Sequence, residues 1–195
     1  KDDKGVQDKS AALNTLLTNG TATADDITKA INDLTSAEAT AKQALADERT
    51  NATNAQTAAT KDTTVDAIYT ASKQAVADGT ATDAQKALVK AYDKVTDLLA
   101  DANDATTTKT DLTSAEASLQ SAVDAYNDER AKVIETGNNL ESASKADTFA
   151  VHNEQAVKDA QDELQTLLTQ AKDNPTNPTT ADLNNAITNL QNVIN

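Results

Sequence analysis

Two apolar stripes at helical spacing, separated by a loop with two prolines, close the chain between residues 156 and 194. Pro175 and Pro178 fit inside neither helix, because proline lacks an N–H and crowds the preceding turn. Thr180 is the expected N-cap of the second helix. The apolar positions are Val157, Ala160, Leu164, Leu167, Leu168 and Ala171 before the loop, and Leu183, Ala186, Ile187, Leu190, Val193 and Ile194 after it. The stretch therefore predicts two amphipathic helices joined by a surface loop.

The same helix–loop–helix pattern occurs twice more upstream. The first copy reads LNTLLT from Leu13, against LQTLLT from Leu164, and the middle copy carries Val95, Leu98 and Leu99. The segment DLTSAEA at residues 33–39 recurs at 111–117. One leucine in the second helix of each copy recurs at an equal interval. These residues are Leu34, Leu112 and Leu190, since 112 − 34 = 78 and 190 − 112 = 78. Matching stripes in three copies indicate internal repetition of one helical unit.

These copies predict an all-α fold of tandem three-helix bundles joined by continuous helices into an elongated rod. The helix between the last two bundles is expected to run without a break through Asp128–Arg130, and Gly137 within it lowers helix stability by about 1 kcal/mol relative to alanine. The expected domains are a partial helical module with an alanine-rich helical spacer at 1–62, a three-helix bundle at 63–127 and a second at 131–195.

The composition narrows the classes of partner. The chain has 195 residues and a formal net charge of −14, spread along its length, which argues against nucleic acid and anionic membranes as partners. The absence of cysteine excludes disulfides and thiolate metal sites. No apolar run is long enough to span a bilayer, and no signal peptide is visible. We expect the chain to be a segment of a longer protein.

The closing segment DNPTNPTTADLNNAITNLQNVI, residues 173–194, resembles the last helix of FIVAR-type three-helix repeats. The whole chain resembles the Ala/Thr-rich helical repeats of Gram-positive cell-wall surface proteins. This resemblance implies an extracellular, wall-attached protein with a role in stalks or adhesion.

The candidates for chemistry are few. His152 is the sole histidine and has no serine or cysteine nucleophile beside it, so we expect a surface residue. The segment Asp101–Asp104 lacks the glycine and glutamate of a calcium loop. Gly20 and Gly79 stand alone before helices and are expected in turns rather than in a phosphate loop. We therefore predict no enzyme activity and no catalytic, cofactor-binding or metal-binding residues.

The tyrosines and the stripes give predictions about packing. Tyr69 and Tyr126 lie on apolar stripes and are expected in the core or at its edge, while Tyr92 is left open between core and surface. Leu167 is expected to be buried in the last module. The segment 46–62 has nothing larger than alanine on its apolar side, so it is expected to be the softest joint.

The function that these predictions favour is a non-catalytic stalk or spacer of a bacterial cell-surface protein, in particular an adhesin. The main alternative is a module that binds a host protein or glycan through exposed helix faces, and a third is an accessory domain of a secreted enzyme. Neighbouring repeats of the same chain are expected as packing partners, and the chain is expected to be a monomer without membrane insertion.

Overall fold

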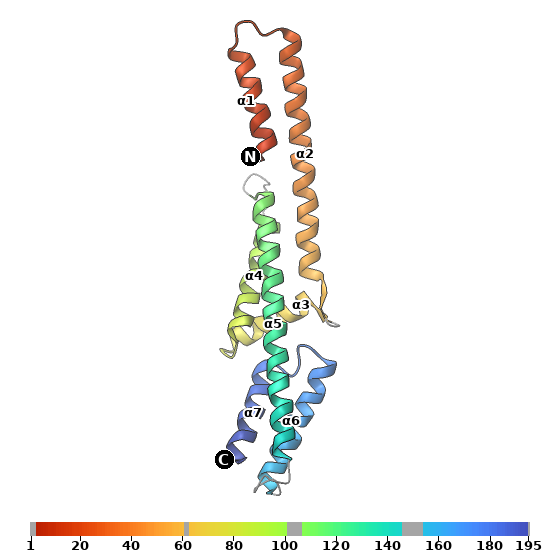
Figure 1. Cartoon of the computed structure of the whole chain (residues 1–195), viewed down its shortest axis with the longest axis vertical. Coiled ribbons are helices and arrows are strands. Elements are labelled where there is room, and N and C mark those ends of the chain that lie inside the picture. Colours follow the sequence, from red (N-terminus) through yellow and green to blue (C-terminus); the bar gives the residue numbers. More distant parts are fainter. Residues whose placement is uncertain (1–2, 61–62, 101–106, 146–153, 195) are drawn as a thin grey trace. The chain divides into compact units, whose positions relative to one another are not determined.

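The protein folds into helices joined by short connections (Figure 1). The computed structural model describes residues 3–60, 63–100, 107–145 and 154–194. In these ranges the helices are α1 (Lys4–Thr18), α2 (Ala24–Thr57), α3 (Val65–Ala77), α4 (Asp83–Ala100), α5 (Lys109–Ser144), α6 (Gln155–Asp173) and α7 (Thr180–Ile194). Two strands of two residues each, β1 (Ala59–Thr60) and β2 (Thr63–Thr64), pair antiparallel immediately before α3. The all-α fold class is confirmed.

Among the described residues, four helices begin with a capping box, in which a threonine and the residue three positions later bond each other's backbone N–H. In α7, Thr179 Oγ1 accepts from the N–H of Asp182 at 3.1 Å, and Asp182 Oδ2 accepts from the N–H of Thr179 at 2.8 Å. The cap is therefore Thr179, and the prediction of Thr180 is wrong by one residue. The other boxes are Thr23 with Asp26 before α2, Thr82 with Gln85 before α4, and Thr108 with Asp111 before α5.

These boxes correct the register of the middle repeat. Leu34 and Leu190 each follow their capping threonine by the same number of residues, 34 − 23 = 11 and 190 − 179 = 11. In α5 the residue at that position is Leu119, since 119 − 108 = 11, and Leu112 lies seven residues earlier. Counted from the caps, Leu119 rather than Leu112 therefore corresponds to Leu34 and Leu190, although the interval of 78 residues is a fact of the sequence. Both leucines of α5 are buried, so the apolar pattern alone fits either register.

The chain groups into two compact units, Lys1–Asn54 with Val95–Ala117 and Ala55–Lys94 with Ser118–Asn195. The boundaries between the units fall within α2, α4 and α5, each of which is one unbroken helix. The continuous helix expected through residues 128–130 is therefore present as part of α5. The division into three domains remains a prediction.

In the first unit, α1 and the beginning of α2 form a hairpin. Lys9 of α1 pairs with Asp33 of α2 at 3.2 Å, and Ala30 of α2 is buried. No residue of α1 is buried. Further along α2, the buried Glu48 accepts a hydrogen bond from Thr113 of α5. The predicted helical spacer is thus helical to Thr57, and it contributes a polar contact that the sequence did not reveal.

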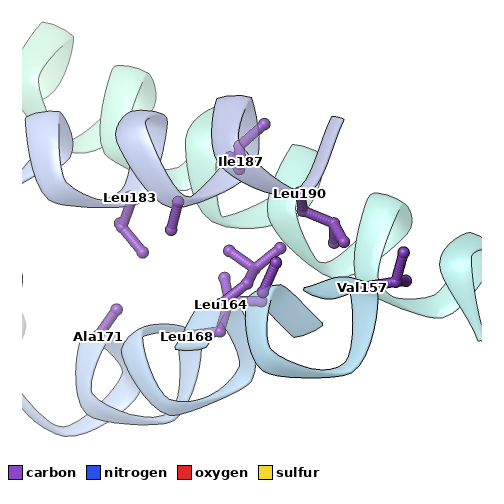
Figure 2. Close-up of a cluster of buried hydrophobic side chains, with 9 residues drawn as sticks. Val157, Leu164, Leu168, Ala171, Leu183, Ile187 and Leu190 are labelled. Carbon is purple, nitrogen blue, oxygen red and sulfur yellow. The ribbon is translucent and has the colours of Figure 1, made fainter. Parts of the chain in front are cut away.

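The second unit contains an apolar cluster that α6 and α7 share (Figure 2). In Figure 2, Leu164 and Leu168 of α6 point toward the side of α7 that carries Leu183 and Leu190. The second half of α5 covers this cluster with Val133, Ile134 and Leu140, which are partly buried against it. The cluster itself consists of Val157, Ala160, Leu164, Leu168, Ala171, Leu183, Ala186, Ile187 and Leu190.

Two residues of this cluster region differ from expectation. Leu167 is only partly buried, so the prediction of a buried side chain is wrong in degree, and Leu164 and Leu168 occupy the interior instead. Gly137 of α5 is buried, and a Cβ atom there would lie 2.9 Å from Leu168 Cδ2 and 3.5 Å from Ile187 Cδ1. Glycine therefore lets α5 approach both α6 and α7 closely.

Candidate functional site

Two tyrosines form a stacked pair between α3 and α4. The ring centroids of Tyr69 and Tyr92 lie 3.9 Å apart with an angle of 11° between the ring planes. Both side chains are partly buried. On the inner side of α3, Ile68 and Ser72 are fully buried, which fixes the face of the helix from which Tyr69 projects. We define the Tyr69–Tyr92 pair with its polar contacts as the tyrosine patch.

The hydroxyl groups of the tyrosine patch bond to carboxylates in a reciprocal manner. Tyr69 donates to Asp93 of α4 at 2.7 Å, and Tyr92 donates to Asp66 of α3 at 2.7 Å. Lys73 donates to the Tyr69 hydroxyl at 2.8 Å, and its Nζ lies 5.2 Å from the ring centroid. Each helix thus gives one tyrosine and one aspartate to the other, which ties α3 to α4.

This arrangement favours the protonated form of Tyr92. Burial, followed by the hydrogen bond to Asp66 and the negative charge of that carboxylate, raises the pKa of Tyr92 to about 12. The hydrogen bond to the Tyr69 hydroxyl, with the charge of that group, raises the pKa of Lys73 above its ordinary value. The raised pKa values favour the protonated, donating forms of Tyr92 and Lys73 at neutral pH.

The predictions for two of the three tyrosines are confirmed. Tyr126 is buried in the core, where its hydroxyl donates to the carbonyl of Pro175 at 3.1 Å. Tyr69 lies at the edge of the core, since it is partly buried and stacked. Tyr92, for which the sequence favours neither core nor surface, is the other half of the stack. Burial raises the pKa of Tyr126 above its ordinary value.

A buried arginine forms a second polar feature, in the connection after α6. Arg130 of α5 is 5 % exposed, and it donates to the carbonyls of Pro178 at 2.7 Å and Asn174 at 2.9 Å. Burial lowers its pKa from the ordinary value. Asn174 is the C-cap of α6, so the cation lies at the negative end of the helix dipole. A pocket of about 420 Å³ opens beside Arg130, between α5 and the end of α6.

A related arginine occurs in the first unit. Arg49 of α2 donates to the carbonyl of Leu99, next to the last residue of α4, at 3.4 Å. Both arginines end the tripeptide Asp-Glu-Arg, and both lie in a long helix where it meets the end of a later helix. Sequence reasoning recognised Asp128–Arg130 as a junction but assigned it no contact. The repeat of the tripeptide was the available signal.

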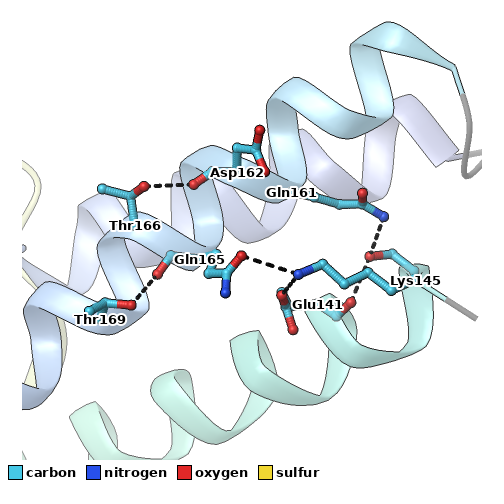
Figure 3. Close-up of polar contacts among 8 residues, drawn as sticks. Glu141, Lys145, Gln161, Asp162, Gln165, Thr166 and Thr169 are labelled. Atoms are coloured by element: carbon cyan, nitrogen blue, oxygen red, sulfur yellow. Dashed lines mark hydrogen bonds and ion pairs between the residues drawn. The ribbon is translucent and has the colours of Figure 1, made fainter.

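Polar contacts also join the end of α5 to α6 (Figure 3). Lys145 donates to Glu141 within α5 and to Gln165 of α6, the second at 3.2 Å. The buried Gln161 of α6 donates to Ser144 Oγ at 3.0 Å. These contacts lie at the edge of the apolar cluster and fix the position of α5 along α6.

The other candidates from the sequence are the glycines, His152 and the segment Asp101–Asp104. Gly79 follows α3 with a φ of 71°, and Gly20 lies in the turn after α1, so both are turn residues as predicted. His152 and Asp101–Asp104 lie outside the described residues. Among the residues that the structure describes, no group of three or more His, Cys, Asp or Glu could hold a metal ion. In the same ranges no helix is long and apolar enough to cross a membrane.

Comparison with known proteins does not assign the chain to a family. No family model, no curated protein and no solved structure matches this chain. The helices and the contacts described above are therefore the basis for assigning a function.

Proposed function

We propose that the chain is a non-catalytic spacer, built from repeated helical modules, in the stalk of a bacterial cell-surface protein. Each module consists of a helical hairpin and the helix that precedes it, so that one long helix ends one module and begins the next. The observation that carries this proposal is the unbroken α5, whose first half begins at a capping threonine like that of α7 and whose second half covers the α6–α7 cluster.

The length of the shared helices suits a spacer. α2 has 34 residues and α5 has 36, which correspond to about 51 and 54 Å at a rise of 1.5 Å per residue. A continuous helix transmits orientation from one module to the next better than a flexible linker does. Length can then be increased by adding modules, as in other repeat proteins.

The contacts of the buried Arg130 and the partly buried Arg49 support the same proposal. Arg130 bonds to two carbonyls after α6, and Arg49 bonds to a carbonyl at the end of α4. In both places a long helix is fixed to the end of a later helix, α6 for Arg130 and α4 for Arg49. The cation lies near the carbonyl end of a helix, where the helix dipole makes the contact favourable. A favourable contact between the two helices stiffens the junction.

The location at a cell wall rests on the resemblance to FIVAR-type and Ala/Thr-rich wall-protein repeats. The net charge of −14 fits this proposal, because self-repulsion keeps an extended chain monomeric.

Distance measurements test the spacer. The chain has no cysteine, so cysteines introduced at the exposed positions Lys4 and Gln191 can be spin-labelled without background. We expect a narrow distribution of long distances, together with a radius of gyration well above the roughly 16 Å of a globule of this length. A radius near that value, or a broad distribution typical of a flexible linker, would refute the proposal.

Binding to a host protein or glycan is the second candidate, and the tyrosine patch favours it, because partly exposed aromatic rings often anchor interfaces. Against it, both hydroxyls are already engaged by Asp66 and Asp93. Screening the chain and its Tyr92→Ala variant on glycan and matrix-protein arrays separates the two: binding that the variant loses supports this candidate, and binding that it retains removes the patch as the cause.

A further inference from the structure

The pocket beside Arg130 lies within the second compact unit, between α5 and the last turn of α6. Its volume of about 420 Å³ falls within the range of roughly 300–1,000 Å³ that is typical of small-molecule sites. On α5, four of its lining residues recur at steps of three and four and therefore share one face of the helix: Asn127, Ala131, Ile134 and Asn138. The opposite wall consists of Ala171, Lys172, Asp173 and Pro175.

Small side chains and the end of a helix account for the hollow. Ala131 of α5 and Ala171 of α6 both line it, and neither has a side chain long enough to fill it. The helix α6 ends at Asp173, so no further turn of it covers this part of α5. The space is therefore open to a ligand from solvent.

Arg130 is the buried polar group of this lining, at 5 % exposed. A guanidinium has five N–H donors. In the part of the chain that the structure describes, the bonds to the carbonyls of Pro178 and Asn174 use two of them, which leaves 5 − 2 = 3 for an acceptor in the pocket. A buried donor without an acceptor is unfavourable, so the site favours an occupant that carries oxygen atoms.

The charges of the lining indicate a neutral occupant. Arg130 and Lys172 are balanced by Glu135 and Asp173, so the formal charge is 2 − 2 = 0, in a chain whose net charge is −14. An anion would be favoured by an excess of cations, and a metal ion by several carboxylates and carbonyls that converge on one point. This lining has neither feature.

The remaining residues specify the kind of neutral group. Asn127, Asn138 and Asn139 each offer an amide that both donates and accepts hydrogen bonds, as a hydroxyl group does. Ile134 and Pro175, together with the two alanines, add an apolar surface. A pyranose ring combines these properties, because hydroxyl groups surround its edge and C–H groups form its faces.

We propose that the pocket between α5 and the end of α6 binds a short neutral saccharide. Its hydroxyl groups accept hydrogen bonds from Arg130 and exchange them with Asn127 and Asn138, while a C–H face of one ring contacts Ile134. This binding function goes beyond the spacer and does not depend on it, because every lining residue belongs to one unit. Its site also differs from the tyrosine patch.

A titration of the full, isotope-labelled chain tests the proposal. The neutral probes are methyl glucoside, N-acetylglucosamine, maltose and lactose, and sodium glucuronate is the anionic comparison. Binding is followed by NMR through the side-chain amide signals of Asn127 and Asn138 and the Nε–H signal of Arg130. We expect at least one neutral probe to shift these signals with a Kd of about 1 mM or tighter.

Three variants make the result specific to the pocket. Asn138→Ala removes a hydrogen-bonding group from an exposed position and should weaken binding by about fivefold. Ala131→Phe, also at an exposed position, fills the hollow and should abolish binding while the helix content by circular dichroism stays unchanged. The matched control is Asn185→Ala, at an exposed position of α7 outside the lining, which should leave the Kd unchanged.

Four outcomes would overturn the inference. The first is that no neutral probe binds at this strength. The second is tighter binding of glucuronate than of the neutral probes, because the pocket would then recognise charge. The third is a set of shifts centred on Tyr69 and Tyr92, which would make the tyrosine patch the binding site. The fourth is an equal loss of affinity in Asn138→Ala and Asn185→Ala.

None of these outcomes alters the distance measurement that tests the spacer, so the two proposals can fail independently.

Discussion

Replacing Gly137 by alanine is the most direct test of how α5 packs. In an exposed helix this change would stabilise the protein by about 1 kcal/mol, because glycine is the poorer helix former. At Gly137 the added Cβ would lie 2.9 Å from Leu168 Cδ2 and 3.5 Å from Ile187 Cδ1. Leu168 is buried, so its side chain can yield only by displacing its neighbours.

Two opposing effects set the magnitude. Overpacking of a core costs about 1–3 kcal/mol, and the gain in helix propensity offsets about 1 kcal/mol of this. We therefore expect Gly137→Ala to lower the free energy of unfolding by about 0–2 kcal/mol. Leu168→Ala alone should cost about 2–5 kcal/mol, as buried leucine truncations do. In that background the space beside Gly137 is free, and Gly137→Ala should become stabilising by up to about 1 kcal/mol.

The assay is a double-mutant cycle on the full chain, with local opening free energies taken from hydrogen exchange in α6 and α7. These local values are preferable to one melting temperature, because a chain with two units need not unfold in one step. We expect a coupling energy of about 1–3 kcal/mol between the two sites. Additive effects, or a stabilising Gly137→Ala in the wild-type background, would refute the close approach of α5.

Four further outcomes follow from the contacts. Arg130→Gln should lower the free energy of unfolding by about 1–3 kcal/mol, since glutamine cannot reach both carbonyls. Hydrogen exchange in α6 and α7 measures this loss, and unchanged exchange would show that the contact is incidental. Ser72→Ala should raise the free energy of unfolding by about 0.5–2 kcal/mol, because among the described residues the buried Ser72 Oγ has no hydrogen-bond partner. A lower melting temperature of the variant would contradict this. The folded-state pKa of Tyr92 is raised to about 12 from an ordinary value of 10.0, so its stabilisation is complete below pH 10 and lost as the pH rises from there to about 12. An alkaline melting series should show this loss in the wild type and a smaller one in Tyr92→Phe. Hydrogen exchange should be faster in residues 46–62 than in 123–140, and equal protection would exclude a soft joint in α2.

The helices could be predicted from the sequence because their apolar residues recur at steps of three and four. Their starts also leave a signal in the sequence, since Thr23 and Thr82 each cap a helix and each has a side-chain acceptor three residues later, Asp26 and Gln85. The error at Thr179 arose from two adjacent threonines, of which only the first has an acidic residue three positions later. The side chain that completes the box, rather than the threonine itself, identifies the cap.

The register of the middle copy could not be taken from the stripe. Alanine and threonine recur so often that DLTSAEA appears at residue 33, ten positions after a capping threonine, and at residue 111, three positions after another. A shift by one heptad keeps apolar residues on the same face. Aligning the capping boxes first would have removed the ambiguity.

The polar contacts could not be predicted from the sequence, for a different reason. The reciprocal bonds of Tyr69 and Tyr92 require two helices whose pairing the sequence does not state. Arg130 likewise finds its acceptors 44 and 48 residues away in the chain. A helical stripe gives the direction of a side chain but not its partner, so such contacts appear only when the helices are placed.

Burial shows the same dependence on a neighbour. Leu17 and Leu168 occupy equal places in nearly identical hexapeptides, and the sequence predicts the same burial for both. Their exposed fractions nevertheless differ, 62 % against 4 %. The hexapeptides hold different places in the two hairpins, since Leu17 is two residues before the C-cap Asn19 and Leu168 is six residues before the C-cap Asn174. In addition, α5 lies over Leu168, at a distance that only glycine permits. An apolar stripe therefore states which face a helix can bury, and the third helix determines whether that face is buried.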